Sequence, residues 1–283
     1  MNTCISVIIP IYNKADLTRQ CVGLNIDHAN TYCEWIVIDN NSDLATKAML
    51  EQLKAQATAK GHLFKIITET SNTGVARAWN KGLTLATGTH YCILNNDCVM
   101  QPGWDTGLLH EDTIGKVNLF CPFVLEPHHF RTPYTLDRFL NLEHWRFIGE
   151  RNKGRYQHYF FGGVVIFGKK EVFETIGKFD EEFWLSLEDM DFEYRAHLKG
   201  YKIGTVGSVT AFHFVSATRK EVPMSELKNR EYYAQKWGWD FVVDENTFWN
   251  KRRRSYRKRL LKYGGYLSNL VGKIPTTTQM HKL

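Results

Sequence analysis

Four short apolar runs, each followed by a stretch of helical pattern, constrain the fold of this chain more than any other feature. They read CISVII at 4–9, EWIVI at 34–38, LFKIIT at 63–68 and HYCIL at 90–94. Short runs of this kind are typical of strands that are buried on both faces. Because the strands alternate with helices through short connections, the pattern predicts an α/β fold with a mostly parallel sheet.

The other elements are predicted from caps, glycines and periodicity. Helices are expected from Asn13 or Asp16 to about residue 29 and over 43–60, 170–176 and 187–199. Residues 201–215 resemble two further short strands, and residues 100–165 look less regular. The run YFFGGVVIFG, which ends at Gly168, carries two central glycines, and these predict a close approach by another group.

Positive charge is concentrated near the C-terminus. The net charge is +6, and residues 251–262 (KRRRSYRKRLLK) hold eight of the 36 Lys and Arg with no acid. Such a helical tail is suited to an anionic membrane surface or to a polyanion such as teichoic acid or nucleic acid. The third interpretation of this segment is a solvated tail that binds neither a membrane nor a polyanion. Because the charge is so confined, a nucleic-acid-binding module is not expected for the whole chain.

The cysteines and the N-terminus bear on the compartment. The six cysteines form no CxxC pair and match no zinc spacing, which favours a reducing environment. The start MNTCISVIIPIYN lacks the basic region of a signal peptide, and no apolar run approaches the ~20 residues of a membrane span. We expect a cytoplasmic protein, with peripheral attachment at the inner face of the membrane as the alternative.

Polar residues follow the predicted strands where ligands bind in parallel α/β sheets, beyond the carboxyl ends. Asp39 closes the second strand, and its carboxylate suits a base or a ribose; its alternative role is to form a turn. Asn95, Asn96 and Asp97 follow the fourth strand. A carboxylate there is a suitable ligand for Mg²⁺ or Mn²⁺, again with a turn as the alternative.

A glycine-containing loop precedes the helix of SNTGVARAWNKG. Asn72 and Gly74 stand before its start, where backbone N–H groups and the helix dipole favour a phosphate. A capped helix without a ligand is the alternative. His213, between apolar neighbours, is expected to be structural unless Asp97 binds a metal, because imidazole suits Mn²⁺ and similar ions.

Acidic residues open the helix expected at 187–199. Ser186 and Asp189 have the spacing of a capping box, which would make the acid structural. The alternative is a general base, which needs a carboxylate held in an apolar cleft near the acceptor hydroxyl. Phe183, Trp184 and Phe192 are the expected walls of that cleft.

Six motifs occur in the order seen in one enzyme family. They are SVIIPIYNK (6–14), IVIDNNS (36–42), SNTGVARAWNKGL (71–83), ILNNDCVMQPGW (93–104), FGGVVIFGKKEVFETIGKFDEEFW (161–184) and LEDMDFEYRAHLKGYKI (187–203). Over residues 4–215 the chain resembles family 2 glycosyltransferases. The resemblance implies the GT-A fold, a Rossmann-like mostly parallel sheet flanked by helices, and inverting sugar transfer from a nucleotide-diphosphate donor.

The resemblance also implies a set of donor contacts. They come from eight positions: Pro10, Tyr12, Asn13, Asp39, Asn72, Gly74, Arg77 and Asn96. The first three resemble the family's first nucleotide-contacting loop, Asp39 matches the acid that reads the base, and residues 72–77 flank the diphosphate. On this basis we expect a transferase domain at 1–220, with donor half 1–100 and acceptor half 101–220, and a helical extension with a basic tail at 221–283.

The same resemblance assigns the chemistry. Asp189 matches the catalytic base, with Glu188 beside it, and Asp97 matches the last acid of a D-x-D metal motif that His213 completes. The expected cofactor is Mn²⁺ or Mg²⁺. Asn95 departs from the motif, so the site has one negative charge fewer. Metal binding is then expected to depend on ligands from the donor diphosphate. 

The donor is expected to be a UDP-linked hexose or N-acetylhexosamine, which makes the enzyme a hexosyltransferase (EC 2.4); dTDP-rhamnose and GDP-sugars remain open. The acceptor is expected to be a glycan, a lipid-linked or another polymeric hydroxyl, as in polysaccharide biosynthesis, or a phosphate-rich polymer such as teichoic acid or modified nucleic acid. A nucleotidyltransferase would need a glycine- and lysine-rich loop where this chain has PIYNK. A degenerate, non-catalytic sugar-nucleotide or glycan-binding protein is the remaining alternative, because of Asn95.

Overall fold

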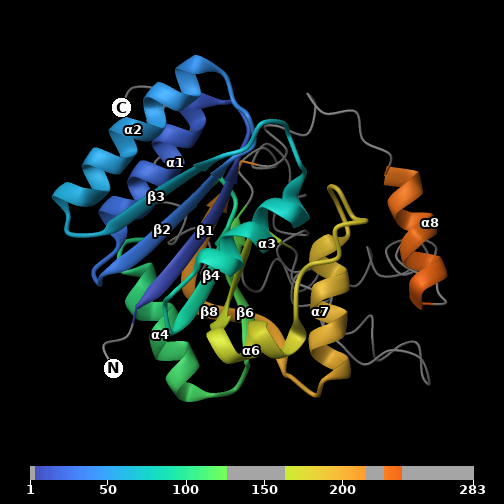
Figure 1. The fold of residues 1–283 in the computed structure, drawn as a ribbon. Coiled ribbons are helices and arrows are strands. Elements are labelled where there is room, and N and C mark those ends of the chain that lie inside the picture. The colour runs from blue at the N-terminus through green and yellow to red at the C-terminus, as the bar shows by residue number, and fades with distance from the viewer. Residues whose placement is uncertain (1–3, 126–162, 215–225, 238–283) are drawn as a thin grey trace, which may run out of the picture.

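The computed structural model describes residues 4–125, 163–214 and 226–237 of the 283-residue chain. In these ranges the backbone forms an eight-stranded sheet of order β3-β2-β1-β4-β7-β6-β8-β5 (Figure 1). The strands are β1 (Ile5–Ile11), β2 (Cys33–Asp39), β3 (Leu63–Thr68), β4 (His90–Leu94), β5 (Cys98–Met100), β6 (Leu119–Leu125), β7 (Val165–Lys169) and β8 (Ile203–His213).

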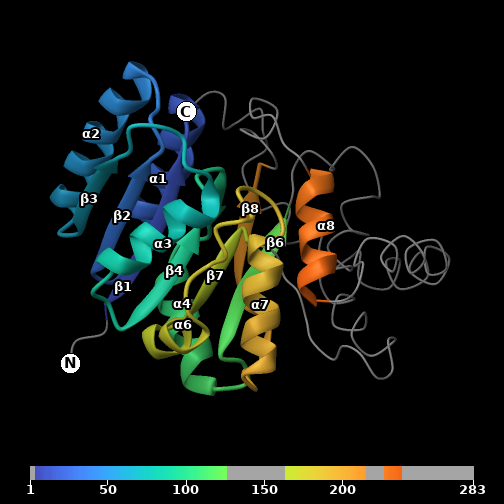
Figure 2. The same cartoon turned by 45° about the vertical axis from the view of Figure 1, so that its right-hand side comes forward.

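Helices cover both faces of this sheet. The helices of the described residues are α1 (Ala15–His28), α2 (Leu44–Ala59), α3 (Val75–Leu85), α4 (Trp104–Ile114), α6 (Lys170–Ile176), α7 (Glu188–Leu198) and α8 (Glu226–Trp237). Helix α8 lies outside α7 and away from the sheet (Figure 2). Figures 1 and 2 show α1 and α2 side by side on one face of β1 to β3, with α3 crossing the other face. The α/β class expected from the sequence is confirmed.

The first half of the sheet is parallel, as expected. Strand β1 pairs in parallel with β2 and β4, and β2 pairs in parallel with β3. Every residue of β1 and β2 is buried, which explains why these segments are apolar without alternation. Their carboxyl ends therefore meet at one edge, and the polar loops that follow them meet there too.

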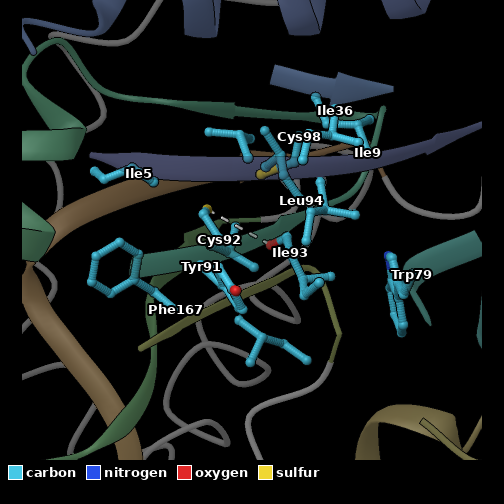
Figure 3. Close-up of a cluster of buried hydrophobic side chains, with 14 of the residues drawn as sticks. Ile5, Ile9, Ile36, Trp79, Tyr91, Cys92, Ile93, Leu94, Cys98 and Phe167 are labelled. Carbon is cyan, nitrogen blue, oxygen red and sulfur yellow. Dashed lines mark hydrogen bonds between the residues drawn. The ribbon is translucent and has the colours of Figure 1, made fainter. Parts of the chain in front are cut away.

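A hydrophobic core fixes that edge to the rest of the molecule. Figure 3 shows part of it, with Ile9 of β1, Cys92 of β4 and Phe167 of β7 among the buried side chains. The largest fully buried side chains include three tryptophans, Trp35, Trp79 and Trp104. Burying one large apolar side chain stabilises a fold by ~1.5–3 kcal/mol relative to leaving it exposed. Loops anchored to such a core are held in place.

The second half of the sheet is mixed. Strand β7 is antiparallel to both β4 and β6, whereas β6 and β8 are parallel. The prediction of two short strands within 201–215 is wrong, because β8 is one strand with a register shift. Pro122 of β6 pairs with Val206, but the next residue, Phe123, pairs with Thr210. The residues around Gly207 bulge out of the ladder, and such an interruption resembles a strand end in the sequence.

The region expected to be irregular is partly regular. Residues 100–165 contain α4 and β6, and residues 126–162 lie outside the described residues. Helix α4 begins after Gly103 and ends at Gly115, both in left-handed conformation, and Pro122 lies within β6. Glycine and proline at these positions hide the elements from a pattern search.

The C-terminal predictions are only partly covered by the structure. Helix α8 lies in the extension expected at 221–283, whereas the basic tail at 251–262 lies outside the described residues. The proposed division at residues 100 and 220 stays a prediction. No helix in the described parts of the chain has both the length and the apolar character required to cross a membrane.

Candidate functional site

Asp39 lies fully buried at the carboxyl end of β2. Its Oδ1 accepts a hydrogen bond from the Ser42 N–H at 2.8 Å, so the residue does form the expected turn. Its Oδ2 is also buried and has no hydrogen-bond partner among the described residues. A buried carboxylate oxygen without a hydrogen bond costs free energy. Such an atom is typical of a site where a ligand donates the hydrogen bond. The turn and the binding role are therefore compatible in this one residue.

The loop after β1 is hydrogen-bonded to the loop after β2. The Asn13 N–H donates to Ser42 Oγ, and Asn13 Oδ1 accepts from the Asp43 N–H, each at 2.9 Å. Asn13 therefore does not cap α1, which begins after Lys14 in left-handed conformation without a side-chain cap. The capping prediction for α1 is wrong because Asn13 is engaged across the sheet edge. 

The other two residues predicted in this first loop lie beside Asn13. Pro10 is buried in β1 opposite Ile38, while Tyr12 is half-buried directly after the strand. The structure thus brings Pro10, Tyr12, Asn13 and Asp39 to one edge of the sheet. Their contacts to a nucleotide stay a prediction.

The loop before α3 is held by its own side chains. Asn72 Oδ1 accepts from the Gly74 N–H at 3.0 Å, and Asn40 Oδ1 accepts from the Thr73 hydroxyl at 3.0 Å. The first N–H of α3, from Val75, donates to the Trp184 carbonyl at 2.9 Å. These two backbone N–H groups, of Gly74 and Val75, are thus occupied within the protein. A phosphate cradle at the start of α3 would need other donors.

Arg77 lies on α3 with its side chain 60% exposed, and its Nε contacts Glu181 Oε2 at 2.9 Å. Asn80 on the same helix donates to the other oxygen of Glu181 at 3.0 Å. The hydrogen bond from Asn80 and, to a smaller extent, the hydrogen bond from Arg77 lower the pKa of Glu181. The acid therefore stays charged opposite the guanidinium. An exposed ion pair of this kind contributes little to stability, so Glu181 holds Arg77 only weakly.

Gly74 has no room for a side chain. Its φ is +84°, and a Cβ built there lies 2.4 Å from the Trp184 carbonyl oxygen and 2.6 Å from the Trp184 ring. This glycine therefore lets the segment after α6 lie directly against the loop that precedes α3. Trp184 therefore connects the loop that precedes α3 to the segment that leads into α7.

Replacement of Gly74 by Ala is expected to destabilise the protein more than replacement of Gly61. Gly61 is the matched control because its φ is +80° and nothing lies within 4 Å of its Cβ position. Both variants place alanine at positive φ, but Gly74 also has a ψ of 174°, which is nearly confined to glycine, and only Gly74→Ala clashes with Trp184, so it should cost about 1–3 kcal/mol more. Urea unfolding of the two variants measures the difference, and equal losses would show that the Trp184 contact is unimportant.

Asp97 and His213 are brought together by the sheet. Strand β5 begins directly after Asp97 and pairs with the end of β8, so that Cys98 stands opposite His213. His213 Nε2 lies 3.3 Å from Asp97 Oδ1, and both residues are largely buried. Two ligands of one ion at ~2.1 Å would lie roughly 3 Å apart, so the pair fits a shared cation.

The surroundings of Asp97 limit what this pair can bind. Among the described residues, no group of three His, Cys, Asp or Glu side chains is arranged to hold a metal. Asn96 is buried and its amide donates to Thr18 Oγ1 on α1 at 2.9 Å, which anchors the turn. Burial and, next, the Asp97 carboxylate raise the pKa of the Cys21 thiol, so this neighbour stays protonated. Within the described ranges, Asp97 and His213 are therefore the two side chains that this candidate metal site offers.

Asp189 is held by backbone N–H groups rather than by a capping box. Its Oδ2 accepts from the Gly163 N–H at 2.6 Å and its Oδ1 from the Met190 N–H at 2.8 Å. Helix α7 begins at Glu188 after Leu187, with no side-chain cap, so the capping prediction is wrong. Asp189 is half-buried, whereas Glu188 is only 5% exposed, and Asp189 is therefore the more accessible carboxylate.

Of the two glycines predicted to permit a close approach, Gly163 does so, and Gly162 lies outside the described residues. A Cβ on Gly163 would lie 2.9 Å from the Trp79 ring and 3.0 Å from Asp189 Cβ. The predicted apolar walls are mostly wrong, since Phe183 and Phe192 are both fully buried. Phe192 stacks on Phe179 with ring centroids 4.2 Å apart, because its face of α7 packs into the core.

Three residues of this region were missed from the sequence or given another role. Asn40 accepts a hydrogen bond from Thr73, the Gly163 N–H orients Asp189, and the Trp184 carbonyl accepts the first N–H of α3. Asn40 stands next to Asp39 in the DNNS cluster, which was the available signal. The partners of Gly163 and Trp184 are distant in sequence, and no local pattern indicates them.

Comparisons with known proteins bear on the family and the fold of the chain. The model of the family described as glycosyl transferase family 2 matches residues 6–177. The chain is 27% identical over 235 residues to the glycosyltransferase AglE of Haloferax volcanii, covering 81% of this chain and 70% of that protein.

Two solved structures show the same fold. A mannosyltransferase from Pyrobaculum calidifontis in complex with GDP-Man and Mn²⁺ has a TM-score of 0.59 at 21% identity, over 76% of this chain and 57% of its own. GalNAc-T7 with UDP, GalNAc and Mn²⁺ has a TM-score of 0.56 at 15% identity, over 75% and 44%. The chain thus spans about half the length of these two proteins.

Proposed function

The chain belongs to glycosyl transferase family 2, and on that premise we propose that it transfers a sugar from a nucleoside-diphosphate donor to a hydroxyl group, with inversion at the anomeric carbon. The GT-A fold is confirmed by the solved structures it resembles. The observation that carries the proposal is the Asp97–His213 pair, which strand pairing places at 3.3 Å. 

The nucleotide is proposed to bind against Asp39 at the end of β2. The unpaired Oδ2 accepts a hydrogen bond from the base or from a ribose hydroxyl. UDP-sugars are the first choice of donor, as the UDP in the GalNAc-T7 structure supports, while the GDP-Man of the mannosyltransferase keeps a GDP-sugar open. Residues 72–77 and Arg77 in particular would flank the diphosphate.

Asp97 and His213 are proposed to hold Mn²⁺ or Mg²⁺ together with diphosphate oxygens. One carboxylate oxygen and one imidazole nitrogen suit Mn²⁺ better than Mg²⁺, which prefers oxygen ligands alone. When bound, the ion supplies neutralisation of the charge on the departing nucleoside diphosphate. Since Asn95 contributes no charge, the donor is expected to increase metal affinity strongly.

Asp189 is proposed as the general base. Its hydrogen bonds from Gly163 and Met190 fix the carboxylate plane, and its half-exposed position leaves it accessible to an acceptor hydroxyl. The carboxylate takes the hydroxyl proton while the acceptor oxygen forms a bond to the anomeric carbon and the diphosphate oxygen leaves. A single displacement of this kind inverts that carbon. Glu188, almost fully buried, is a neighbour rather than the base in this scheme.

The acceptor is proposed to be a glycan, a lipid-linked saccharide or another polymer. A phosphate-rich acceptor such as teichoic acid remains the alternative, on the strength of the basic segment at 251–262. That segment lies outside the described residues, so its role at a membrane or on a polyanion stays a prediction from sequence.

A thermal-shift screen tests the donor proposal. We expect one nucleotide sugar, with Mn²⁺, to raise the unfolding temperature, because a ligand at 100 times its Kd stabilises the native state by ~2.7 kcal/mol. The panel should include UDP-, GDP- and dTDP-sugars, and each should be repeated with EDTA. A shift that persists without metal would argue against the Asp97–His213 site, and no shift with any donor would argue against the function.

A further inference from the structure

Helix α8 packs against the segment that carries Glu188 and Asp189, although it follows the family-matched region by nearly fifty residues. Figure 2 shows α8 beside α7 on the outer side of the molecule. Tyr233 of α8 is 1% exposed and packs with Phe183, Met190 and Tyr194 in a small cluster separate from the main core. The contact between α8 and α7 is therefore a packed interface.

Polar contacts fix the register of α8 on this segment. Lys236 Nζ lies 2.5 Å from Asp180 Oδ2 and 2.7 Å from the fully buried Asp191 Oδ1, to which Trp237 Nε1 also donates at 3.0 Å. Burial alone would raise the pKa of Asp180, but hydrogen bonds from Lys236, the Glu182 N–H and Tyr232 lower it. The acid therefore stays ionised, and Lys236 joins α8 both to Asp180, before α7, and to Asp191 on α7.

The loop that leads into α7 has an unusual backbone. Ser186 (φ +82°) and Leu187 (φ +71°) are consecutive non-glycine residues in the left-handed region, immediately before Glu188. Such residues persist only where the surroundings hold them. The start of α7 has no side-chain cap to do so.

Asn229 of α8 contacts this loop directly. Its side-chain amide donates to the Leu185 carbonyl at 2.6 Å and to the Ser186 carbonyl at 3.0 Å, and the residue is 8% exposed. One NH₂ group thus binds two successive carbonyls at the point where the chain turns left-handed. A buried amide is well suited to this, because both of its hydrogens are used.

We propose that Asn229 is a positioning residue for sugar transfer. By holding the carbonyls of Leu185 and Ser186, it keeps the left-handed turn that places Glu188 and Asp189 at the start of α7. The inference rests on the proposed function, in which Asp189 receives the acceptor proton. It makes α8 part of the working catalytic unit, although it lies outside the family-matched residues.

The test compares Asn229→Leu with Glu231→Leu in the full chain. Leucine has the same branching and the same number of side-chain heavy atoms as asparagine, although it is bulkier, and it donates no hydrogen bond. Glu231 is an exposed residue of the same helix. In Asn229→Leu we expect kcat to fall on the order of tenfold to hundredfold while the donor KM changes less than about threefold, because a small misplacement of the base is costly. Glu231→Leu should match the wild type.

A second change separates positioning from general damage. Ser186→Gly, added to Asn229→Leu, should restore part of kcat, because glycine adopts the left-handed conformation without strain. Loss of activity without rescue, or a proportional rise in KM, would overturn the inference. Unchanged kcat in Asn229→Leu would overturn it as well.

Amide hydrogen exchange provides a readout that needs no substrate. Residues 186–190 should exchange faster in Asn229→Leu than in the wild type, while β1 and β2 remain protected. Unchanged exchange at 186–190 counts against the inference. If the wild type transfers no sugar from any donor, the proposed function fails, and the exchange result still decides whether Asn229 holds the turn.

Discussion

Replacement of Asp97 by Asn is expected to reduce metal-dependent sugar transfer on the order of 10²–10³-fold, as loss of one charge-stabilising group in an active site commonly does. Asparagine keeps the size of the side chain but leaves the site without a charged oxygen, since residue 95 is already an asparagine. The remaining His213 nitrogen, a neutral carbonyl and the diphosphate would hold the ion weakly. Initial rates of sugar transfer measure this loss, and calorimetric titration of the nucleoside diphosphate, with and without Mn²⁺, measures the weaker metal-dependent binding.

Matched variants make this result specific. Asp105→Asn removes another buried carboxylate that begins α4 and accepts hydrogen bonds from the backbone of Asn30 and Thr31. It should lower stability without altering the dependence of binding on Mn²⁺. His213→Asn should weaken binding less than Asp97→Asn and recover at higher Mn²⁺. Metal-dependent binding of normal strength in Asp97→Asn would contradict the assignment of this site.

Replacement of Asp189 by Asn is expected to lower kcat on the order of 10²–10⁴-fold, because an amide cannot accept the acceptor proton in the transition state. Donor binding should stay within about threefold of the wild type, since Asp189 acts on the acceptor side and leaves the nucleotide contacts intact. Rapid-mixing measurements of a single turnover, combined with donor titration, separate the two quantities.

Glu188→Gln is the control for the identity of the base. Glu188 is the adjacent carboxylate and is almost fully buried, so its replacement should affect stability more than chemistry. A larger loss of kcat in Glu188→Gln than in Asp189→Asn would move the base to Glu188. Normal turnover in Asp189→Asn would remove Asp189 from the mechanism.

Local patterns predicted the elements whose residues interact mainly with their neighbours. The strands at 63–68 and 90–94 and the helix at 170–176 agree with the structure, because continuous apolar runs and flanking glycines determine them locally. The bulge in β8 was missed because it depends on the register of β6. Without knowledge of the pairing with β6, the residues around Gly207 look in the sequence like the end of a strand.

The site was predicted unevenly for a similar reason. Asp39 at the end of β2 and Asp97 shortly after β4 are predictable as candidates because polar residues follow buried strands there. The structure places His213 Nε2 3.3 Å from Asp97 Oδ1, and the role of this pair as metal ligands stays a prediction. The surroundings of Asp189 were not predicted. Its hydrogen bond from Gly163 comes from another element, and the hydrogen bonds of Asn229 come from a helix with no recognisable motif. Long-range contacts of this kind leave no signal in a single sequence.

The release of nucleoside diphosphate from nucleotide sugars tests the central claim most directly. The wild type, Asp97→Asn and Asp189→Asn are each incubated with a donor panel and glycan acceptors, with Mn²⁺ or with EDTA. We predict that the wild type consumes one donor only in the presence of metal and that both variants are slower on the order of 10²-fold or more. Metal-independent consumption, or equal rates in all three proteins, would contradict the account.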